Sequence, residues 1–248
     1  MKPEFSEREY EFCFNTEFYR RYTGAIIGAP SIPSHRLERL HGYDIAFRLR
    51  QGNIQYSLFL QYKVSRFISN RAGKNIQIYD FHGGPYYYFY LERLDKSPQH
   101  NLLYWLRQGG EEVYYSAPIF YERNILEQHF VNNLIIDNSV FIDPSGVGLI
   151  TDCARHKISY DQNGTKAAFY SELKEIRNPI KFSILKETLK RKKIDEAYFN
   201  KLFLSLKIGI SEIYRADFEM PEKYIELPII SQCAYLLRKY YRLQWLMF

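Results

Sequence analysis

Residues 43–65 read YDIAFRLRQGNIQYSLFLQYKVS, and this stretch decides the fold. Apolar residues alternate with polar or small residues on both sides of a Gln-Gly-Asn turn, and a period of two is typical of half-buried strands. The stretch therefore predicts a β-hairpin with strands at 43–50 and about 55–65. Because successive side chains of a strand point to opposite faces, Gln61 and Lys63 are expected on the same face.

The segments around this hairpin predict a mixed α/β fold. A helix from Ser6 to about Tyr22 begins with a capping box between Ser6 and Glu9. After the hairpin we expect a strand at 85–91, a helix at 99–108, a strand at 112–120 and two extended pieces within 138–160. Further helices are predicted at 165–177, 181–209 and 228–248, with prolines as breaks. Residues 1–160 are thus expected to form an α/β domain, followed by a mostly helical, basic region at 161–248.

The composition excludes several classes of protein. The chain has 248 residues, of which 46% are hydrophobic and 25% charged, and this balance excludes a disordered, collagen-like or low-complexity chain. No apolar run is long enough to span a bilayer, and the acidic, aromatic start is unlike a secretory signal. The cysteines, Cys13, Cys153 and Cys233, are odd in number and far apart, so they indicate neither a disulfide framework nor a paired zinc site. We therefore expect a cytoplasmic protein with no membrane partner.

The hairpin also carries residues suited to phosphodiester hydrolysis. Such a reaction needs a carboxylate to hold a divalent cation, and a positive side chain to stabilise charge on the phosphate or to assist the attacking water. Asp44 supplies the carboxylate and Lys63 the charge, while the side-chain carbonyl of Gln61 can replace a second carboxylate as a neutral ligand. These residues predict a site for Mg²⁺ or Mn²⁺.

The order of these residues resembles a known nuclease superfamily. A helix containing Glu, an Asp at the start of a strand and a Gln-x-Lys on the next strand, followed by a helix and a strand, is similar to the PD-(D/E)xK restriction-endonuclease-like nucleases. The Gln variant resembles their Mrr-like branch. The resemblance covers about residues 6–120, with Tyr43 in place of the Pro before the Asp and Gln61 in place of the second acid.

The resemblance implies a restriction-endonuclease-like central mixed sheet flanked by helices. It also implies a metal-dependent endodeoxyribonuclease that acts on duplex DNA, in restriction or antiviral host defence. Asp44, Gln61 and Lys63 correspond to its catalytic residues. Tyr10-Glu11 stands where the Mrr-like branch usually has Phe-Glu, which makes Glu11 a catalytic residue and a metal ligand together with Asp44 and Gln61.

Other carboxylates remain candidates for the helix acid. Glu17 lies at the centre of the apolar stripe of the N-terminal helix, so it is expected either to pair with a cation such as Arg21 or to be held by a metal. Glu38, six residues before Asp44, is a third candidate. Gln99 opens a predicted helix where some relatives place a further active-site Gln, and the alternative role for Gln99 is capping or solvating the helix start.

Basic residues outside the hairpin are candidates for contact with DNA. The net charge of +6 is compatible with a nucleic-acid partner, because neutralising phosphates releases counterions. The candidates for DNA binding are Ser65, Arg66, Lys190, Arg191, Lys192 and Lys193. A solvated lysine-rich helix face is the alternative for the last four residues.

The aromatic C-terminal segment, which ends in Trp245-Leu246-Met247-Phe248, is expected to dock on its own domain or to mediate a homodimer or binding to a partner subunit. Two alternatives to an active nuclease follow from these patterns. The first is a nuclease-like fold that has lost catalysis and serves as a DNA-binding or scaffolding subunit. The second is an unrelated interaction protein in which the Asp, Gln and Lys have come together by accident.

Overall fold

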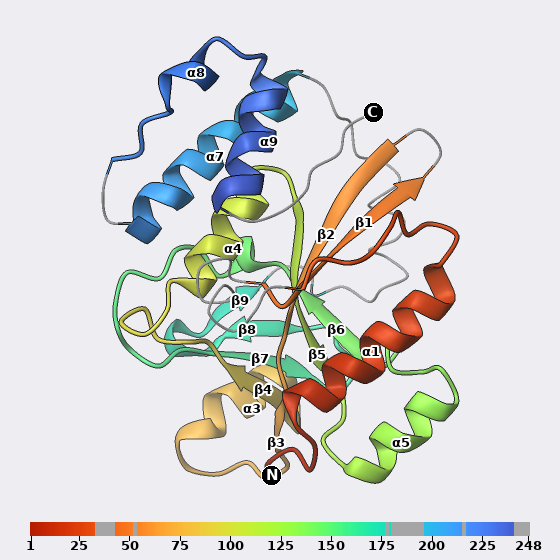
Figure 1. Cartoon of the computed structure of the whole chain (residues 1–248). Coiled ribbons are helices and arrows are strands. Elements are labelled where there is room, and N and C mark those ends of the chain that lie inside the picture. The colour runs from red at the N-terminus through yellow and green to blue at the C-terminus, as the bar shows by residue number, and fades with distance from the viewer. Residues whose placement is uncertain (33–42, 52–53, 177–178, 180–195, 215–216, 241–248) are drawn as a thin grey trace.

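The computed structural model of the chain describes residues 1–32, 43–51, 54–176, 179, 196–214 and 217–240 (Figure 1). These residues form a mixed α/β structure with two β-sheets. The α-helices are α1 (Glu7–Tyr22), α3 (Ile76–His82), α4 (Gln99–Gln108), α5 (Arg123–Val131), α7 (Glu196–Tyr214), α8 (Glu222–Ile225) and α9 (Ile229–Tyr240). The strands are β1 (Ile45–Gln51), β2 (Ile54–Tyr62), β3 (Arg66–Ile68), β4 (Tyr86–Tyr90), β5 (Glu112–Pro118), β6 (Ser139–Ile142), β7 (Lys157–Asp161), β8 (Ala167–Phe169) and β9 (Lys174–Ile176).

The predicted hairpin is confirmed and lies in the first sheet, sheet A, whose strand order is β1-β2-β5-β6. β1 and β2 pair antiparallel, from Ile45 opposite Leu60 to Gln51 opposite Ile54. β2 and β5 are parallel, and a parallel pair needs a long crossover connection, which here includes α4. The hairpin therefore brings the end of β2 into the middle of the sheet, next to whatever the crossover places beside it.

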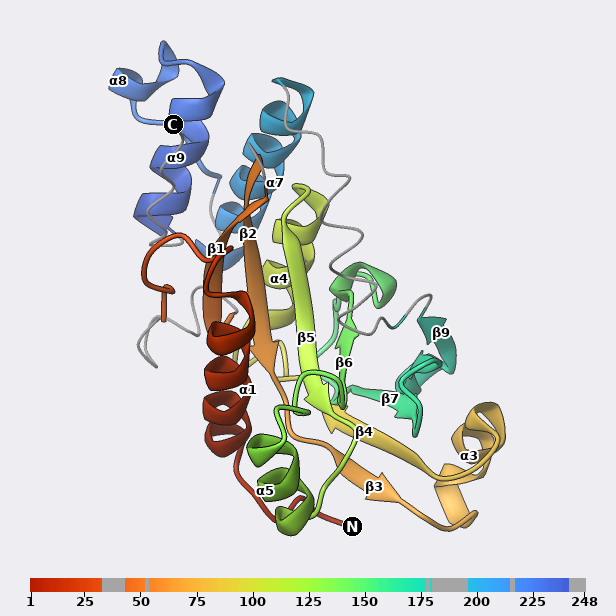
Figure 2. The same cartoon turned by 90° about the vertical axis from the view of Figure 1, so that its right-hand side faces the viewer.

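Helix α1 covers one face of sheet A, as its apolar stripe predicts (Figure 2). Tyr10, Phe14 and Phe18 are fully buried against the side chains of β2 that point toward the helix. The predicted capping box is confirmed, since the Glu9 amide donates to Ser6 Oγ at 3.2 Å and the Ser6 amide donates to Glu9 Oε2 at 2.8 Å. Capping and burial together explain why the helix begins where the sequence places it.

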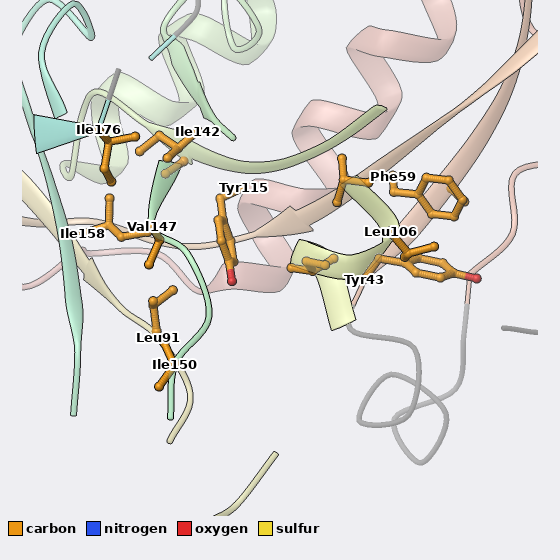
Figure 3. Packing of buried hydrophobic residues seen from close by; sticks show 14 of the residues in the cluster. Tyr43, Phe59, Leu91, Leu106, Tyr115, Ile142, Val147, Ile150, Ile158 and Ile176 are labelled. Atoms are coloured by element: carbon orange, nitrogen blue, oxygen red, sulfur yellow. The ribbon is translucent and has the colours of Figure 1, made fainter. Parts of the chain in front are cut away.

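The second sheet, sheet B, is antiparallel throughout and has the order β3-β4-β7-β8-β9. Its inner face and the α4-facing side of sheet A share one hydrophobic core, and helices α4, α7 and α9 contribute to the same core. Figure 3 shows Tyr115 of β5 between the aliphatic residues near sheet B and the group around Leu106. The two sheets are thus joined through buried side chains rather than through shared strands.

The helix predicted at 165–177 is wrong, because this segment forms β8, a 3₁₀ turn at Tyr170–Glu172, and β9. A tight turn directs the chain back along β7: Asp161 Oδ1 accepts from the amides of Thr165 and Lys166 at 2.6 and 2.9 Å. Gly164 in this turn has a φ of +65°, which favours glycine. Sheet B therefore continues past residue 160, up to Ile176, and cross-strand pairing overrides the helical propensity of the segment.

The C-terminal helices lie at the end of the molecule opposite α3, where α7 packs on α4 and α9 packs on α7 (Figure 1). α7 approaches α4 closely at Gly109, where a Cβ atom would lie 2.9 Å from Leu202 Cδ1. Of the helices predicted at 181–209 and 228–248, residues 196–214 and 229–240 are helical, and 180–195 and 241–248 lie outside the described residues. In the part of the chain that the structure describes, no helix has both the length and the apolar character needed to cross a bilayer.

Candidate active site

The start of β1 and the end of β2 bring Asp44 and Gln61 into direct contact. The backbone amide of Asp44 donates to Leu60 O at 2.9 Å, which extends the hairpin pairing by one residue. The Asp44 Oδ2 atom accepts from Gln61 Nε2 at 2.8 Å and from the Tyr62 amide at 2.6 Å. Both side chains are buried. The structure therefore places the predicted carboxylate and the predicted amide ligand in one site.

Gln99, at the first position of α4, extends this site to a third residue. Its Nε2 atom donates to Gln61 Oε1 at 2.9 Å. Pro98 is the N-cap of α4 and makes no side-chain cap hydrogen bond, so capping does not explain the buried Gln99 side chain. Asp44, Gln61 and Gln99 form a continuous chain of hydrogen bonds, which we call the carboxylate–amide chain.

The carboxylate sets the orientation of both amides. An ionised carboxylate only accepts hydrogen bonds, so Gln61 must turn its NH₂ group toward Asp44 and its oxygen toward Gln99. Gln99 must then present its own NH₂ group to Gln61. The carboxylate–amide chain is thus polarised from α4 toward Asp44, and every contact in it has a donor and an acceptor.

Lys63 lies just beyond the last residue of β2, and its neighbours differ from those of Gln61. Its amide donates to Ser116 O at 2.9 Å, while its Nζ atom lies 3.7 Å from Glu7 Oε1 in the first turn of α1. The Lys63 side chain is only 14% exposed. Because β2 ends at Tyr62, strand alternation no longer governs Lys63, and its ammonium group reaches toward α1.

The two predicted helix acids have different surroundings. Glu11 lies within electrostatic reach of the Tyr62 phenol, whose pKa is raised well above its usual value by burial first and then by the charges of Tyr10, Glu11 and Asp44. Glu11 and Asp44 thus act on the same buried side chain. The Tyr62 hydroxyl donates to Asn15 Oδ1, one turn further along α1.

Glu17 has a structural role in place of the predicted catalytic one. Its Oε2 atom accepts from the Ile135 amide at 2.7 Å and its Oε1 atom from the Ile136 amide at 3.3 Å. Arg21 Nη2 lies 2.8 Å from Glu17 Oε1, which is the cation pairing that the sequence offered as the alternative to a metal. The Glu17 carboxylate ties α1 to the segment between α5 and β6. The third candidate, Glu38, lies outside the described residues.

The structure also corrects part of the predicted DNA-binding set. Ser65 is fully buried and its hydroxyl bonds to the Tyr160 hydroxyl, so it is not available to a phosphate. Arg66 begins β3, and its guanidinium lies 5.4 Å from the centroid of the Tyr90 ring. Lys190, Arg191, Lys192 and Lys193, as well as the aromatic segment 245–248, lie outside the described residues.

His100 and Tyr115 form a second buried polar pair beside the carboxylate–amide chain. The Tyr115 hydroxyl lies 2.8 Å from His100 Nδ1, and His100 Nε2 lies 2.7 Å from Gly148 O. Since a carbonyl oxygen only accepts, Nε2 carries the proton and Nδ1 accepts from the tyrosine. Burial lowers the pKa of His100 to about 4, and burial followed by the charge of Asp44 raises that of Tyr115. The sequence offered one signal for this pair, the adjacent polar residues Gln99 and His100 at a helix start.

We expect stability to fall in acid because His100 is neutral in the fold. Its folded pKa is depressed from 6.5 to about 4, so the unfolded chain takes up the proton first as the pH falls. The contribution of neutral His100 to the free energy of unfolding is present above the pKa of His100 in the unfolded chain. It is lost as the pH falls toward the pKa of His100 in the folded protein. Between about pH 7 and pH 5 the cost is about 2 kcal/mol.

Urea unfolding at the two pH values measures this cost. In His100→Gln, whose amide can both donate and accept, the difference between the two unfolding free energies should shrink by about 2 kcal/mol. Burial also lowers the pKa of His82 to about 4. His82 should therefore make a second, separate contribution to the pH dependence of the unfolding free energy, which His82→Gln should remove. An unchanged pH dependence in His100→Gln would contradict a neutral, buried His100.

The oxygen donors at the end of β2 determine which ions suit the site. Asp44 offers a carboxylate, and Gln61 offers an amide oxygen once its side chain turns. Hard cations such as Mg²⁺ are commonly bound through one or two carboxylates, with water filling the remaining positions. Within the described ranges, no group of three or more His, Cys, Asp or Glu side chains is arranged to hold a metal ion. The donor set is therefore a small one, of one carboxylate and one amide.

Comparison of the chain with protein-family models, with curated proteins and with solved structures gives no match. We therefore argue function from the geometry of Asp44, Gln61, Gln99 and Lys63.

Proposed function

We propose that this protein is a metal-dependent deoxyribonuclease with its centre at the end of β2. The observation that carries the proposal is the buried Asp44 carboxylate hydrogen-bonded to Gln61, two residues before Lys63. The element order supports it, because α1 precedes Asp44 and β1, Gln61 and Tyr62 end β2 with Lys63 directly after them, and α4 leads to β5. This is the succession on which the resemblance to the PD-(D/E)xK nucleases rests.

The residues present fit a magnesium or manganese ion. Asp44 and Gln61 would hold it, and Glu11 is the acid of α1 whose charge, like that of Asp44, acts on the Tyr62 phenol. A bound divalent ion supplies Lewis-acid stabilisation of phosphate charge and lowers the pKa of a bound water. Asp44 supplies the negative charge that attracts such an ion, and its buried position strengthens that attraction.

Gln99 acts in this proposal as a positioning residue. For Gln61 to direct its oxygen toward an ion, its amide must turn over, which exchanges the positions of Oε1 and Nε2. A carboxylate or a hydrocarbon at position 99 would favour only one of these orientations or neither. The Gln99 amide can accept from Gln61 Nε2 as readily as it now donates to Gln61 Oε1, so it partners both.

Lys63 supplies the positive charge in this proposal. Its pair with Glu7 is long, at 3.7 Å, and the Glu7 side chain is 40% exposed. Exposed or partly exposed ion pairs contribute little to stability, so a phosphate oxygen can replace Glu7 at low cost. Lys63 would then stabilise negative charge on a phosphodiester bound at the end of β2.

The proposal predicts that Lys63→Ala loses cleavage. Supercoiled and linear duplex DNA are incubated with magnesium, manganese or EDTA, and the parent should cut only with a metal ion. Lys63→Ala, purified identically, should be slower by about 100- to 1000-fold, the usual effect of removing one donor that stabilises transition-state charge. Lys96→Ala, which removes an exposed lysine before α4, is the matched control and should cut like the parent.

Thermal melting separates the other outcomes of this experiment. An absence of cutting together with a melting temperature that ignores the metal would contradict the proposal and favour a DNA-binding or scaffolding role. An absence of cutting with a metal-induced rise in melting temperature would keep the metal site and contradict plain duplex DNA as the substrate. Equal cleavage by the parent and Lys63→Ala would contradict the assignment of Lys63.

A further inference from the structure

One face of sheet B gathers tyrosines and basic side chains that the proposed nuclease centre does not use. Along β4, Tyr87 and Phe89 point into the core, so Tyr86, Tyr88 and Tyr90 point to the opposite face. Helix α3 covers the Tyr86 end of that face, where the His82 ring lies 5.3 Å from the Tyr86 ring. Tyr88 and Tyr90 lie beyond this contact and stay partly exposed.

Strand pairing places cations beside these two rings. Arg66 of β3 is opposite Tyr88, and Lys157 of β7 is opposite Tyr90. The Lys157 Nζ atom lies 5.1 Å from the ring centroid of Tyr88 and 5.4 Å from that of Tyr90. Directly opposite residues on one sheet face are close neighbours, so this alternation of ring and charge is built into the register.

The loop before β7 and the 3₁₀ turn after β8 complete the surface. The guanidinium of Arg155, which is exposed, lies 3.7 Å from the ring centroid of Tyr90, a stacking distance. The Tyr170 ring lies 4.5 Å from Lys157 Nζ. We call the whole surface the tyrosine–cation face; its members are Arg66, Tyr88, Tyr90, Arg155, Lys157 and Tyr170.

The positive charges of this face are not neutralised by acids. Two surface arginines elsewhere have carboxylate partners: Arg71 pairs with Asp80 at 2.6 Å and Arg93 pairs with Asp95 at 2.9 Å. Among the residues that the structure describes, no ion pair involves Arg66, Arg155 or Lys157. Within the described ranges, these three cations contact tyrosine rings, which orient a cation without cancelling its charge.

We propose that the tyrosine–cation face binds a single-stranded segment of nucleic acid. Proteins hold single strands by combining basic side chains that follow the phosphates with aromatic rings on which bases stack. Arginine guanidinium planes also stack on bases, and the Arg155 guanidinium already lies over the Tyr90 ring with its side chain exposed. A duplex hides its base faces inside the helix, so it would leave the exposed ring surface unused.

This proposal is independent of the proposed nuclease activity, because it rests on sheet B and not on Asp44, Gln61 or Lys63. The two sites are nevertheless consecutive along the chain, since Lys63 follows β2 and Arg66 begins β3. Binding measured in EDTA tests the tyrosine–cation face alone, because a metal-dependent centre is silent there. A failure of one proposal therefore leaves the other one standing.

Fluorescence anisotropy with a labelled oligothymidylate of about 20 nucleotides tests the proposal. Tyr90→Ala should weaken binding about tenfold, because it removes a ring on which one base stacks, whereas Tyr90→Phe keeps the ring and should bind within about twofold of the parent. Arg155→Ala should weaken binding and reduce the slope of log affinity against log salt by about 0.7 for each lost phosphate contact. Tyr19→Ala and Arg93→Ala remove exposed residues outside this face and should leave binding unchanged.

Three results would overturn the proposal. The first is the absence of oligothymidylate binding by the folded parent. The second is binding of the oligothymidylate by Tyr90→Ala with the same affinity as by the parent, which would leave only a general attraction for anions. The third is a duplex or an acidic peptide of equal charge that binds the parent as tightly as the oligothymidylate. Circular dichroism melts of each variant check that it is folded, and Arg155→Ala, at an exposed position, remains informative if Tyr90→Ala does not fold.

Discussion

Asp44→Asn is expected to lose metal-dependent DNA cleavage by about a thousandfold or more. The substitution removes one negative charge and leaves the shape of the side chain unchanged. A bound metal ion contributes several kcal/mol of charge stabilisation. Asp44 is the one carboxylate in the buried chain of Asp44, Gln61 and Gln99, so its loss should remove most of that contribution. The magnesium-induced rise in melting temperature should disappear together with cleavage.

The hydrogen bonds of Asp44 make this variant informative. The asparagine oxygen can still accept from Gln61 Nε2 and from the Tyr62 amide, so the hairpin end should stay intact. Asp80→Asn is the matched control, because Asp80 is an exposed aspartate of α3 paired with Arg71. The measurements are cleavage rates and melting curves for both variants with magnesium and with EDTA. Cleavage by Asp44→Asn at the parent rate would remove Asp44 from the proposed centre.

Phe14→Ala is expected to destabilise the protein by about 3–5 kcal/mol, a large part of the stability of an ordinary domain. The Phe14 ring is fully buried between α1 and sheet A, with ring centroids 5.3 Å from Tyr62 and 5.9 Å from Phe141. Its removal leaves a cavity that two sheet strands and a helix can close only partly. The same contacts hold Tyr62, whose amide binds Asp44, so a loosened α1 should also weaken the candidate site.

Phe12→Ala is the matched control on the same helix. The Phe12 side chain is 66% exposed, so its truncation should change the free energy of unfolding by no more than about 0.5 kcal/mol. Urea unfolding followed by circular dichroism gives both values under the same conditions. Similar losses in the two variants would contradict the packing of α1 on sheet A.

Local patterns were sufficient for the elements that carry Asp44 and Gln61. The capping box at Ser6 and Glu9 marks the start of α1 because both partners lie within one helical turn. The alternation of apolar and polar residues in 43–65 specifies the hairpin, because a shift of the strand pairing by one residue would turn every apolar side chain to the opposite face. Segment 165–177 shows the limit of such patterns, since its residues suit a helix until the turn at Gly164 directs them along β7.

The sequence ranked the residues that complete the candidate site only through the resemblance. Glu11 and Glu17 lie on the same predicted helix; the family spacing favoured Glu11, but helix periodicity alone did not separate the two. The fold does so through the Ile135 and Ile136 amides, more than a hundred residues away, which take up the Glu17 carboxylate. Gln99 remained a secondary candidate because its contact with Gln61 spans 38 residues and depends on the crossover between β2 and β5.

The sequence by itself determined the hairpin, the helix that covers it, and the proximity of Asp44 to Gln61. Each of these depends on neighbours in the chain or on the pairing of two strands that are adjacent in sequence. The spacing of apolar residues along the chain indicates both. Only the tertiary structure decided that Gln99 joins Asp44 and Gln61, that Glu17 serves the fold, and that Arg66, Arg155 and Lys157 share one face with three tyrosines. Those contacts arise when distant segments bury apolar surface together, and that burial is not encoded in any local pattern.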